Sequence, residues 1–270
     1  MNKVIVSAGF DNLTSRDMRF LEEAAKLGDL HVLLWSDEAV RHITGNNPNL
    51  PLAERAYFVQ AVRYVTRIQV AAAPFDPDTL PDLDGSRPDL WCVDEKCASA
   101  AKETFCARHD IRYRLIPDLT CAGFPAPAPL PLTGRRKVLV TGCYDWLHTG
   151  HVRFFEECSE LGDLFVVVGH DANIRLLKGE GHPMFQEDER RYLTGSIRYV
   201  TRALVSSGMG WMDAEPEIAV LKPDLYVVNE DGDKPEKRGF CARHGLEYVV
   251  LKRTPKPGLP RRSSTDLRGF

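Results

Sequence analysis

The sequence predicts two successive α/β domains, each built around a doubly wound parallel β-sheet with helices on both faces. Two observations predict this fold class: the chain repeats itself, and short apolar runs alternate with helical stretches inside each repeat. Residues 3–29 match residues 137–163 without a gap. After a one-residue shift near 48–52, the match resumes and reaches 105–109 and 240–244. A repeat of this length indicates a duplicated domain, and 270 residues suffice for two.

The elements follow the same order in both copies. Each copy opens with a short β-branched strand, at 4–6 and 138–140, and a glycine-containing turn. Amphipathic helices at 19–27 and 153–161 and apolar strands at 30–35 and 164–169 come next. The rest of the second copy is expected to form a helix at 187–198, a strand at 203–206, a helix ending near 221, a strand at 225–228, a helix at 236–244 and a strand at 248–251. Right-handed crossovers then place ligands at the carboxyl ends of the strands.

The repeat and the composition together set the expected domain boundaries. Residues 121–136 are rich in proline and alanine, which is typical of a stiff linker. We therefore expect a first domain at 1–120, a linker at 121–136 and a second domain at 137–270.

Charge and cysteine content exclude several classes of protein. The net charge of −3 gives no overall attraction to nucleic acid or to a membrane surface, and no apolar run approaches the ~18 residues that span a bilayer. The seven cysteines are odd in number and form no CxxC pair, which favours reduced thiols and a cytoplasmic location. We expect neither nucleic acid nor membrane as a partner.

The segment GCYDWLHTGH, residues 142–151, connects the first strand of the second copy to its helix. Backbone N–H groups and the helix dipole favour an anionic group at such a helix start. His148 and His151 are three residues apart, so both imidazoles point the same way on a helical turn. Gly150 leaves the backbone open to a ligand. Two imidazoles at this place suit phosphate oxygens that gain charge during phosphoryl or nucleotidyl transfer.

This segment resembles the HxGH signature of the nucleotidyltransferase superfamily that includes the cytidylyltransferases. Further matches follow in order through residue 267: Lys178 lies where such enzymes carry a lysine that reaches the triphosphate, and Glu189-Arg190 with Arg198 resembles the helix that supplies an arginine to the nucleotide. Residues 263–267 (SSTDL) resemble the end of the RTxxISTT motif, whose hydroxyls bind phosphates. The motif's arginine matches Arg253, but an insertion at 255–261 leaves Arg261 and Arg262 as alternatives.

The resemblance implies a set of site residues and a cofactor. The expected catalytic residues are His148, His151, Lys178 and Asp145. The expected nucleotide-binding residues are Gly142, Cys143, Tyr144, Gly150, Arg190, Arg198, Glu230, Asp231, Arg253, Arg262, Ser263, Ser264 and Thr265. Mg²⁺ is expected on the nucleotide phosphates, with no dedicated protein metal ligands.

The resemblance also implies a reaction. Tandem domains, GCYD before the histidines and the terminal STDL resemble ethanolamine-phosphate and glycerol-phosphate cytidylyltransferases, whereas LKGEG at 177–181 resembles the adenylyltransferase domain of heptose-phosphate enzymes. The acidic pair Glu230-Asp231 lacks the tryptophan that follows it in cytidylyltransferases. We expect transfer of CMP from CTP to a small phosphate or phosphonate substrate, with release of pyrophosphate. The alternatives are an ATP-dependent adenylyltransferase acting on a sugar phosphate and a non-catalytic nucleotide-binding regulator.

Other interpretations of these residues stay open or are excluded. His148 and His151 could bind zinc with His170 or His182 as further ligands. Asp145 could cap a turn, and Arg190 and Arg198 have counterparts in the first copy, which favours a partly structural role. A class I aminoacyl-tRNA synthetase would need a KMSKS-type segment, and an NAD-dependent dehydrogenase would need G-x-G-x-x-G. Neither motif occurs.

The first copy has lost the residues that suggest chemistry in the second. Thr14 stands in place of His148, Asp17 in place of His151 and Thr44 in place of Lys178. An aspartate facing a triphosphate would repel it. The first copy is therefore expected to fold without catalysing, as an internal partner that makes the monomer a pseudo-dimer. A homodimer is the alternative.

Overall fold

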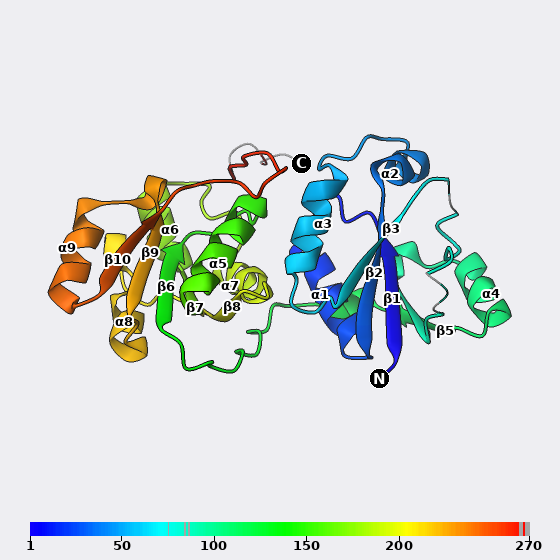
Figure 1. Ribbon diagram of the computed structural model, residues 1–270, viewed down its shortest axis with the longest axis horizontal. Helices are drawn as coiled ribbons and strands as arrows, with labels where there is room; N and C mark the ends of the chain where they lie inside the picture. The colour runs from blue at the N-terminus through cyan, green and yellow to red at the C-terminus, as the bar shows by residue number, and fades with distance from the viewer. Residues whose placement is uncertain (75, 84, 86, 265–266, 268–270) are drawn as a thin grey trace. The chain divides into compact units, whose positions relative to one another are not determined.

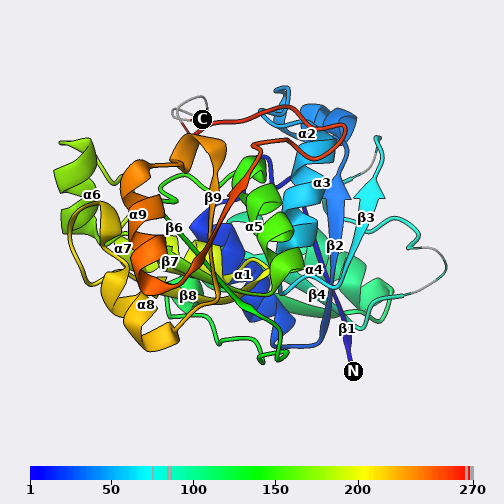
Figure 2. The same ribbon diagram turned by 60° about the vertical axis from the view of Figure 1, so that its left-hand side comes forward.

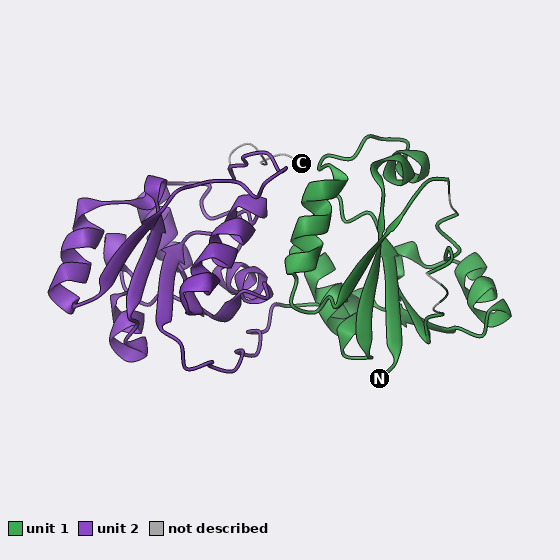
Figure 3. Cartoon of the chain, in the orientation of Figure 1, with its two compact units in different colours: residues 1–123, 270 green, residues 124–269 purple. Residues whose placement is uncertain are grey.

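The computed structural model describes every residue except 75, 84, 86, 265–266 and 268–270. It divides into two compact units, residues 1–123 and 124–269 (Figure 3). Each unit contains one five-stranded sheet in which every strand pair is parallel. The expected α/β class and the two parallel sheets are thus confirmed.

The two units follow a similar succession of elements, to which unit 2 adds η3 and α8 between its third and fourth strands (Figure 1). Unit 1 contains β1 (Lys3–Ala8), α1 (Ser15–Ala25), β2 (Asp29–Trp35), α2 (Asp37–Thr44), α3 (Leu52–Ala61), β3 (Arg67–Ala71), β4 (Leu90–Asp94), η1 (Glu95–Cys97), α4 (Ala100–Arg108), β5 (Arg112–Ile116) and η2 (Asp118–Cys121). Unit 2 contains β6 (Lys137–Gly142), α5 (Thr149–Leu161), β7 (Asp163–Val168), α6 (Asp171–Lys178), α7 (Glu187–Gly195), β8 (Val200–Val205), η3 (Gly210–Met212), α8 (Glu215–Leu221), β9 (Leu225–Asn229), η4 (Glu230–Gly232), α9 (Pro235–His244) and β10 (Glu247–Leu251).

The strand order places a binding crevice at the middle of each sheet. The order is β3-β2-β1-β4-β5 in unit 1 and β10-β9-β6-β7-β8 in unit 2. The chain winds outward from β6 through β7 to β8, then crosses back to β9 on the other side of β6. Ligands bind outside the carboxyl ends of parallel strands at such a reversal, because the crossovers on either side diverge there. In unit 2 this point lies between β6 and β9.

Alternating side chains divide the core of unit 2 between two faces of the sheet. Leu139, Tyr226 and Val228 belong to one buried cluster with Ile218 of α8 and Phe240 of α9. Helices α8 and α9 lie side by side on this face, and α5 and α7 cover the opposite face (Figures 1 and 2). Because neighbouring residues of a strand point to opposite faces, both faces of the sheet are apolar, as expected for a fully covered parallel sheet.

Several elements differ from the sequence prediction, and three helices of unit 2 illustrate why. Helix α6 was not expected, although His170 caps it and Asp171 lies in its first turn. Helix α5 begins at Thr149 rather than 153, because His148 is its N-cap. Helix α7 ends at Gly195 rather than 198, where the Ser196 hydroxyl donates to the Tyr192 carbonyl and competes with the helical pattern.

The proline- and alanine-rich segment predicted as a linker contacts unit 2 along part of its length. The Leu130 amide donates to the Thr201 carbonyl at 2.8 Å, and the Thr133 hydroxyl donates to Asp163 at 2.8 Å. The Pro127 ring lies so close to Gly195 that a β-carbon there would meet it at 2.9 Å. These residues therefore pack as a strap on the second unit.

Two further findings bear on the sequence expectations. All seven cysteines are free thiols, and burial raises the pKa of several, including Cys106 to about 11. Every helix in the described part of the chain falls short of the length and apolar character needed to cross a bilayer.

Candidate active site

The start of helix α5 is the centre of the candidate site. Its N-cap is His148, whose Nδ1 accepts a hydrogen bond from the Gly150 amide at 3.1 Å. The first turn contains no acidic side chain. The N–H groups and dipole at this end of the helix are therefore not neutralised by a carboxylate within that turn. The loop between β6 and α5 brings this helix start to the carboxyl end of β6, beside the crevice.

The two histidines lie against each other, as their spacing predicted. Their ring centroids are 4.0 Å apart, with an angle of 32° between the ring planes. The buried Tyr144 ring packs edge-on to His151, with centroids 5.3 Å apart, and also against Phe155. Tyr144 adopts a left-handed backbone conformation with φ of 50°, which turns the chain beneath the imidazoles. Its main contribution is thus to hold His151 in place.

Burial and the neighbouring charges favour the neutral form of His151. Burial is the largest effect that lowers its pKa well below the ordinary value, and His148, Arg253 and Lys178 lower the pKa further. The Nδ1 atom of His151 is buried without a hydrogen-bond partner among the described residues. A bound anion would reverse this balance, because negative charge close to an imidazole favours its protonated, donating form.

A cavity of about 210 Å³ opens in front of these histidines. Most of the predicted site residues line it: Gly142, Cys143, Tyr144, Asp145, His148, Gly150, His151, Lys178, Asp231, Arg253 and Ser264. It is also lined by residues that were not predicted: Thr141, Phe154, Val228, Asn229, Gly232 and Lys237. The sequence motifs from β6, α5, α6, η4 and the C-terminal segment therefore converge on one space.

Lys178 reaches the cavity from an unexpected helix. It is the last residue of α6, it is exposed, and the glycine-containing turn at 179–181 follows it directly. Its charge lowers the pKa of both His151 and the neighbouring Cys143, although burial dominates the Cys143 shift and raises the pKa of that thiol. An exposed lysine at the rim of a cavity suits a mobile polyphosphate chain.

Asp145 positions a loop at the cavity wall. Its Oδ1 accepts hydrogen bonds from the Met184 and Phe185 amides at 2.7 and 3.0 Å, and its Oδ2 lies 3.5 Å from His182 Nδ1. The equivalent Asp11 of unit 1 accepts from the Asn49 and Leu50 amides in the same way. Because both copies share the contact, it belongs to the common framework, and the predicted catalytic role of Asp145 stays a prediction.

Arg190 is a correction to the sequence analysis. Its side chain is fully buried, and its guanidinium donates to the Phe185, Cys143 and Gly169 carbonyls and to Asp171. Four of its five N–H groups thus donate to the protein itself, and burial keeps the side chain away from a bound nucleotide. In unit 1, Arg55 donates to Leu50, Gly9, Trp35 and Asp37, at the equivalent positions. The arginine therefore ties the loops at the carboxyl end of the sheet together.

Four other predicted residues lie outside the cavity. Arg198 is exposed beyond the end of α7, so the second arginine of the predicted pair does not reach the site either. Glu230 accepts from the Arg253 amide at 3.3 Å, and Ser263 and Arg262 do not line the cavity. Thr265 falls outside the described residues.

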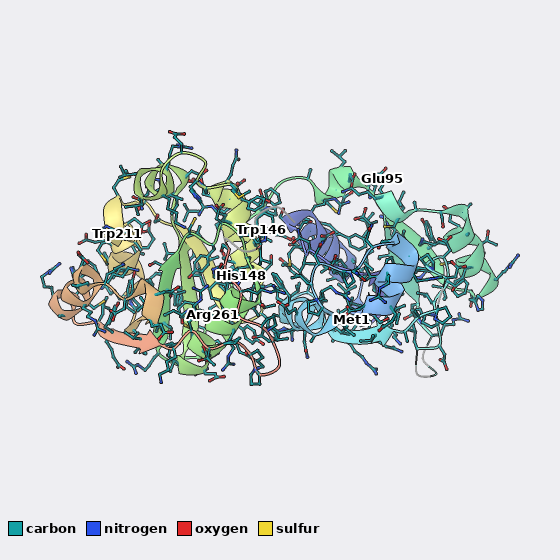
Figure 4. The ribbon with its side chains drawn as sticks, turned by 90° about the horizontal axis from the view of Figure 1, so that it is seen from above. Met1, Glu95, Trp146, His148, Trp211 and Arg261 are labelled. Atoms are coloured by element: carbon teal, nitrogen blue, oxygen red, sulfur yellow. The ribbon has the colours of Figure 1, made fainter. Side chains whose placement is uncertain are left out.

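The C-terminal segment returns from β10 to the start of α5 (Figure 1). Arg253 forms an ion pair with Asp231 at 2.6 Å and donates to the Arg262 carbonyl, while the Ser264 hydroxyl donates to the Trp146 carbonyl. Arg261 and Arg262 line a smaller adjoining space together with Gly150; Figure 4 labels His148, Trp146 and Arg261 in this unit. Of the three arginines that the insertion left open, Arg253 is the one in the main cavity.

The described part of the chain offers no set of side chains that would hold a metal ion. That part contains no group of three or more His, Cys, Asp or Glu side chains arranged around a metal position. His170 and His182, the further ligands considered for zinc, have other contacts: His170 caps α6, and His182 lies beside Asp145.

Comparisons with known proteins agree with this location. The family model described as Cytidylyltransferase-like matches residues 139–268. The FAD synthase of Aciduliprofundum boonei is 32% identical over 136 residues, which are 49% of this chain and 84% of that protein. The bifunctional protein HldE of Nitratiruptor sp. is 36% identical over 100 residues, and that of Shewanella sp. strain ANA-3 is 39% identical over 103. The matched part spans 21% of each HldE protein.

Among solved structures, the lipopolysaccharide core biosynthesis protein of Thermoplasma volcanium is 26% identical to this chain. The match covers 45% of this chain and 99% of that one, with a TM-score of 0.40.

Proposed function

Because the chain belongs to the cytidylyltransferase-like family of nucleotidyltransferases, we propose that unit 2 transfers a nucleoside monophosphate to a small phosphate- or phosphonate-bearing acceptor. The observation that carries the proposal is the pair of adjacent imidazoles at a helix start whose first turn has no acidic side chain, facing a cavity that also receives Lys178 and Arg253. Three separate segments, the start of α5, the end of α6 and the C-terminal segment, contribute cationic or donor groups to that space, which suits a triphosphate.

An acceptor oxygen attacks the α-phosphorus of the nucleotide, and the bond from that phosphorus to the pyrophosphate oxygen breaks. A phosphate monoester has a second pKa near 6, so the nucleophile is already ionised at neutral pH and needs no general base. The protein then has to align the acceptor with the α-phosphorus and to stabilise the charge that develops in the transition state. The α5 N–H groups and the two histidines receive the α-phosphate, and Lys178 and Arg253 balance the leaving pyrophosphate.

Mg²⁺ fits this site as a companion of the nucleotide rather than as a ligand of the protein. The cavity carboxylates are engaged: Asp231 pairs with Arg253, and one oxygen of Asp145 accepts two amides while the other is buried. A cation bound by the phosphates would neutralise part of their charge. The residues of this chain would still hold the α-phosphate and orient the attack.

The relatives favour ATP as the nucleotide, whereas the sequence analysis placed CTP first. FAD carries an adenylyl group, and both a FAD synthase and HldE proteins are among the relatives that this chain resembles. We therefore place ATP first, in agreement with the LKGEG segment at 177–181. CTP is the second candidate, favoured by the cytidylyltransferase-like family model and the tandem organisation.

Unit 1 is proposed to lack catalysis and to act as an internal partner of unit 2. In its equivalent helix start, Thr14 and Asp17 satisfy each other and leave no donor pair for phosphate. A separately produced segment of residues 124–270 tests the partner role. We expect it to lose solubility or activity relative to the full chain, and a fully active, soluble monomer would refute the role.

The function itself is tested by screening the four nucleoside triphosphates against phosphate and phosphonate acceptors, with pyrophosphate release as the readout. His148→Ala and His151→Ala are expected to lower kcat by about two orders of magnitude or more while leaving the fold intact, since each removes a donor to the transition state. Thr14→Ala, at the equivalent position of unit 1, is the matched control and should retain turnover. Near-normal turnover in both histidine variants would rule out this site.

A further inference from the structure

Lys237 is a cavity residue that the motifs did not identify. It lies in the first turn of α9, half-buried, with its ammonium 5.9 Å from the centre of the Tyr226 ring. It lines the same cavity as the two histidines. Among the described residues, no carboxylate lies within ion-pair distance of its Nζ, and the Tyr226 ring is its close neighbour.

The equivalent lysine of unit 1 is neutralised. Lys102 occupies the same place in α4, and its Nζ lies 2.6 Å from Asp78. The Ser99 hydroxyl also donates to this carboxylate at 2.7 Å, and the hydrogen bond from Lys102 is the largest effect that lowers the Asp78 pKa. In unit 1, which lacks the histidine pair, the lysine therefore has a carboxylate of the protein as its counterion.

The matching carboxylate of unit 2 has been taken by other groups. Asp213 corresponds to Asp78 by the same 135-residue offset that relates Lys237 to Lys102. It accepts hydrogen bonds from the Ser206 hydroxyl at 2.7 Å and from the Asn173 side chain at 2.9 Å. Lys237 therefore lines the cavity without the ion pair that its counterpart Lys102 makes in unit 1.

Leaving this cation without a close counterion has a physical cost. Burial is the largest effect that lowers the Lys237 pKa, and Lys234 lowers it further, against the opposing charges of Asp213 and Asp231. A partly desolvated charge is retained in a cavity when a ligand compensates it. The compensating ligand must be an anion.

The position of Lys237 indicates which anion it would bind. The two histidines proposed to receive the α-phosphate belong to the start of α5, which covers one face of the sheet, whereas α9 covers the opposite face (Figure 1). In an in-line displacement, the attacking oxygen and the leaving pyrophosphate lie on opposite sides of the α-phosphorus. A cation that enters from the α9 side is therefore placed for the attacking group.

We propose that Lys237 binds the phosphate or phosphonate group of the acceptor and so restricts the enzyme to acceptors with a dianionic head group. This assignment rests on the proposed nucleotidyl transfer in unit 2. It separates the roles of the cavity cations: Arg253 and Lys178 serve the nucleotide, and Lys237 serves the second substrate.

The test is a two-step binding titration on the full chain. The protein is first saturated with the α,β-methylene analogue of ATP or CTP, whichever binds more tightly, and is then titrated with inorganic phosphate by calorimetry. Lys237→Met is expected to weaken phosphate binding by about tenfold or more while the dissociation constant of the analogue changes less than about twofold. Lys234→Met is the matched control, because Lys234 is exposed at the N-cap of the same helix and does not line the cavity.

The outcomes separate the two proposals. Equal phosphate affinity in the Lys237 and Lys234 variants would overturn the role of Lys237, as would a loss of analogue affinity confined to Lys237→Met or an absence of phosphate binding to the saturated wild-type protein. Failure of the wild-type protein to bind either analogue would overturn the nucleotidyl transfer itself, and the Lys237 role with it.

Discussion

Helices α1 and α5 start at equivalent positions, yet their first turns are built for opposite purposes. In α1, the Asp17 carboxylate accepts from the Thr14 amide and hydroxyl, both at 2.8 Å, and the Thr14 hydroxyl accepts from the Asp17 amide. In α5, one histidine caps the helix and the other faces a cavity. The first turn of α1 satisfies itself, whereas that of α5 keeps donors available for an anion.

Burial affects the two equivalent side chains in a parallel way. It is the largest effect that raises the pKa of Asp17, and the largest that lowers the pKa of His151. Both shifts favour the neutral form, because the site excludes water in both units. The difference between the units therefore lies in the chemistry placed at one shared position rather than in the architecture around it.

The strongest test of the shared architecture is the buried arginine. Arg190→Met and Arg55→Met should each lower the free energy of unfolding by about 3–5 kcal/mol, because each leaves several carbonyls and a partly exposed carboxylate without a hydrogen-bond donor. Urea unfolding of the full-length variants measures this. If Arg190→Met unfolded like the wild type and only weakened nucleotide binding, the arginine would be a site residue and the comparison would fail.

Gly150→Ala sharpens the comparison at the helix start. A β-carbon there would lie 2.9 Å from His148 Cε1 and 3.0 Å from its Nδ1, so the imidazole must move. We expect kcat/KM to fall about tenfold with little change in the melting temperature, since misplacement by a fraction of an ångström disturbs alignment more than folding. Arg16→Ala, at the equivalent position of unit 1, should leave kcat/KM unchanged. An unaltered rate in Gly150→Ala would show that the position of the His148 ring is not critical.

A smaller effect is expected in the pH dependence of stability. An unfolded histidine takes up a proton as the pH falls through about 6.5, while buried His151 resists protonation until a lower pH. The unfolded state then binds more protons, so acid lowers the stability of the folded chain. The melting temperature of His151→Gln should fall less between pH 7.5 and pH 5.5 than that of the wild type. Equal decreases would mean that His151 is protonated in the free protein.

The architecture could be predicted from the sequence because the repeat and the apolar runs report burial directly. The β-branched strands, the helix at 236–244 and the two sheets follow from periodicity, which depends on each side chain's contact with the core. Helix α6 was missed because eight residues with two buried side chains give too short a pattern, although His170 and Asp171 supplied an N-terminal signal.

The site could be predicted where a motif fixes local geometry and not where burial decides the role. His148, His151 and Gly150 share one helical turn, so their spacing alone indicates that they face one space. Arg190 was misassigned because no sequence pattern distinguishes a buried guanidinium that bonds to the protein from one that faces a ligand. Its counterpart Arg55 was the available signal. Lys237 was missed because it lies in a charged helical turn. Its proposed role becomes visible only when Asp213 is seen to bond to Ser206 and Asn173 rather than to this lysine.

The central claim is that one nucleotide binds per chain, at the start of α5. Calorimetric titration of the full chain with the α,β-methylene analogue gives the stoichiometry directly. We predict one site that is abolished in the double variant His148→Ala/His151→Ala and retained in Thr14→Ala/Asp17→Ala. Two sites per chain, or one site that survives the loss of both histidines, would contradict the account.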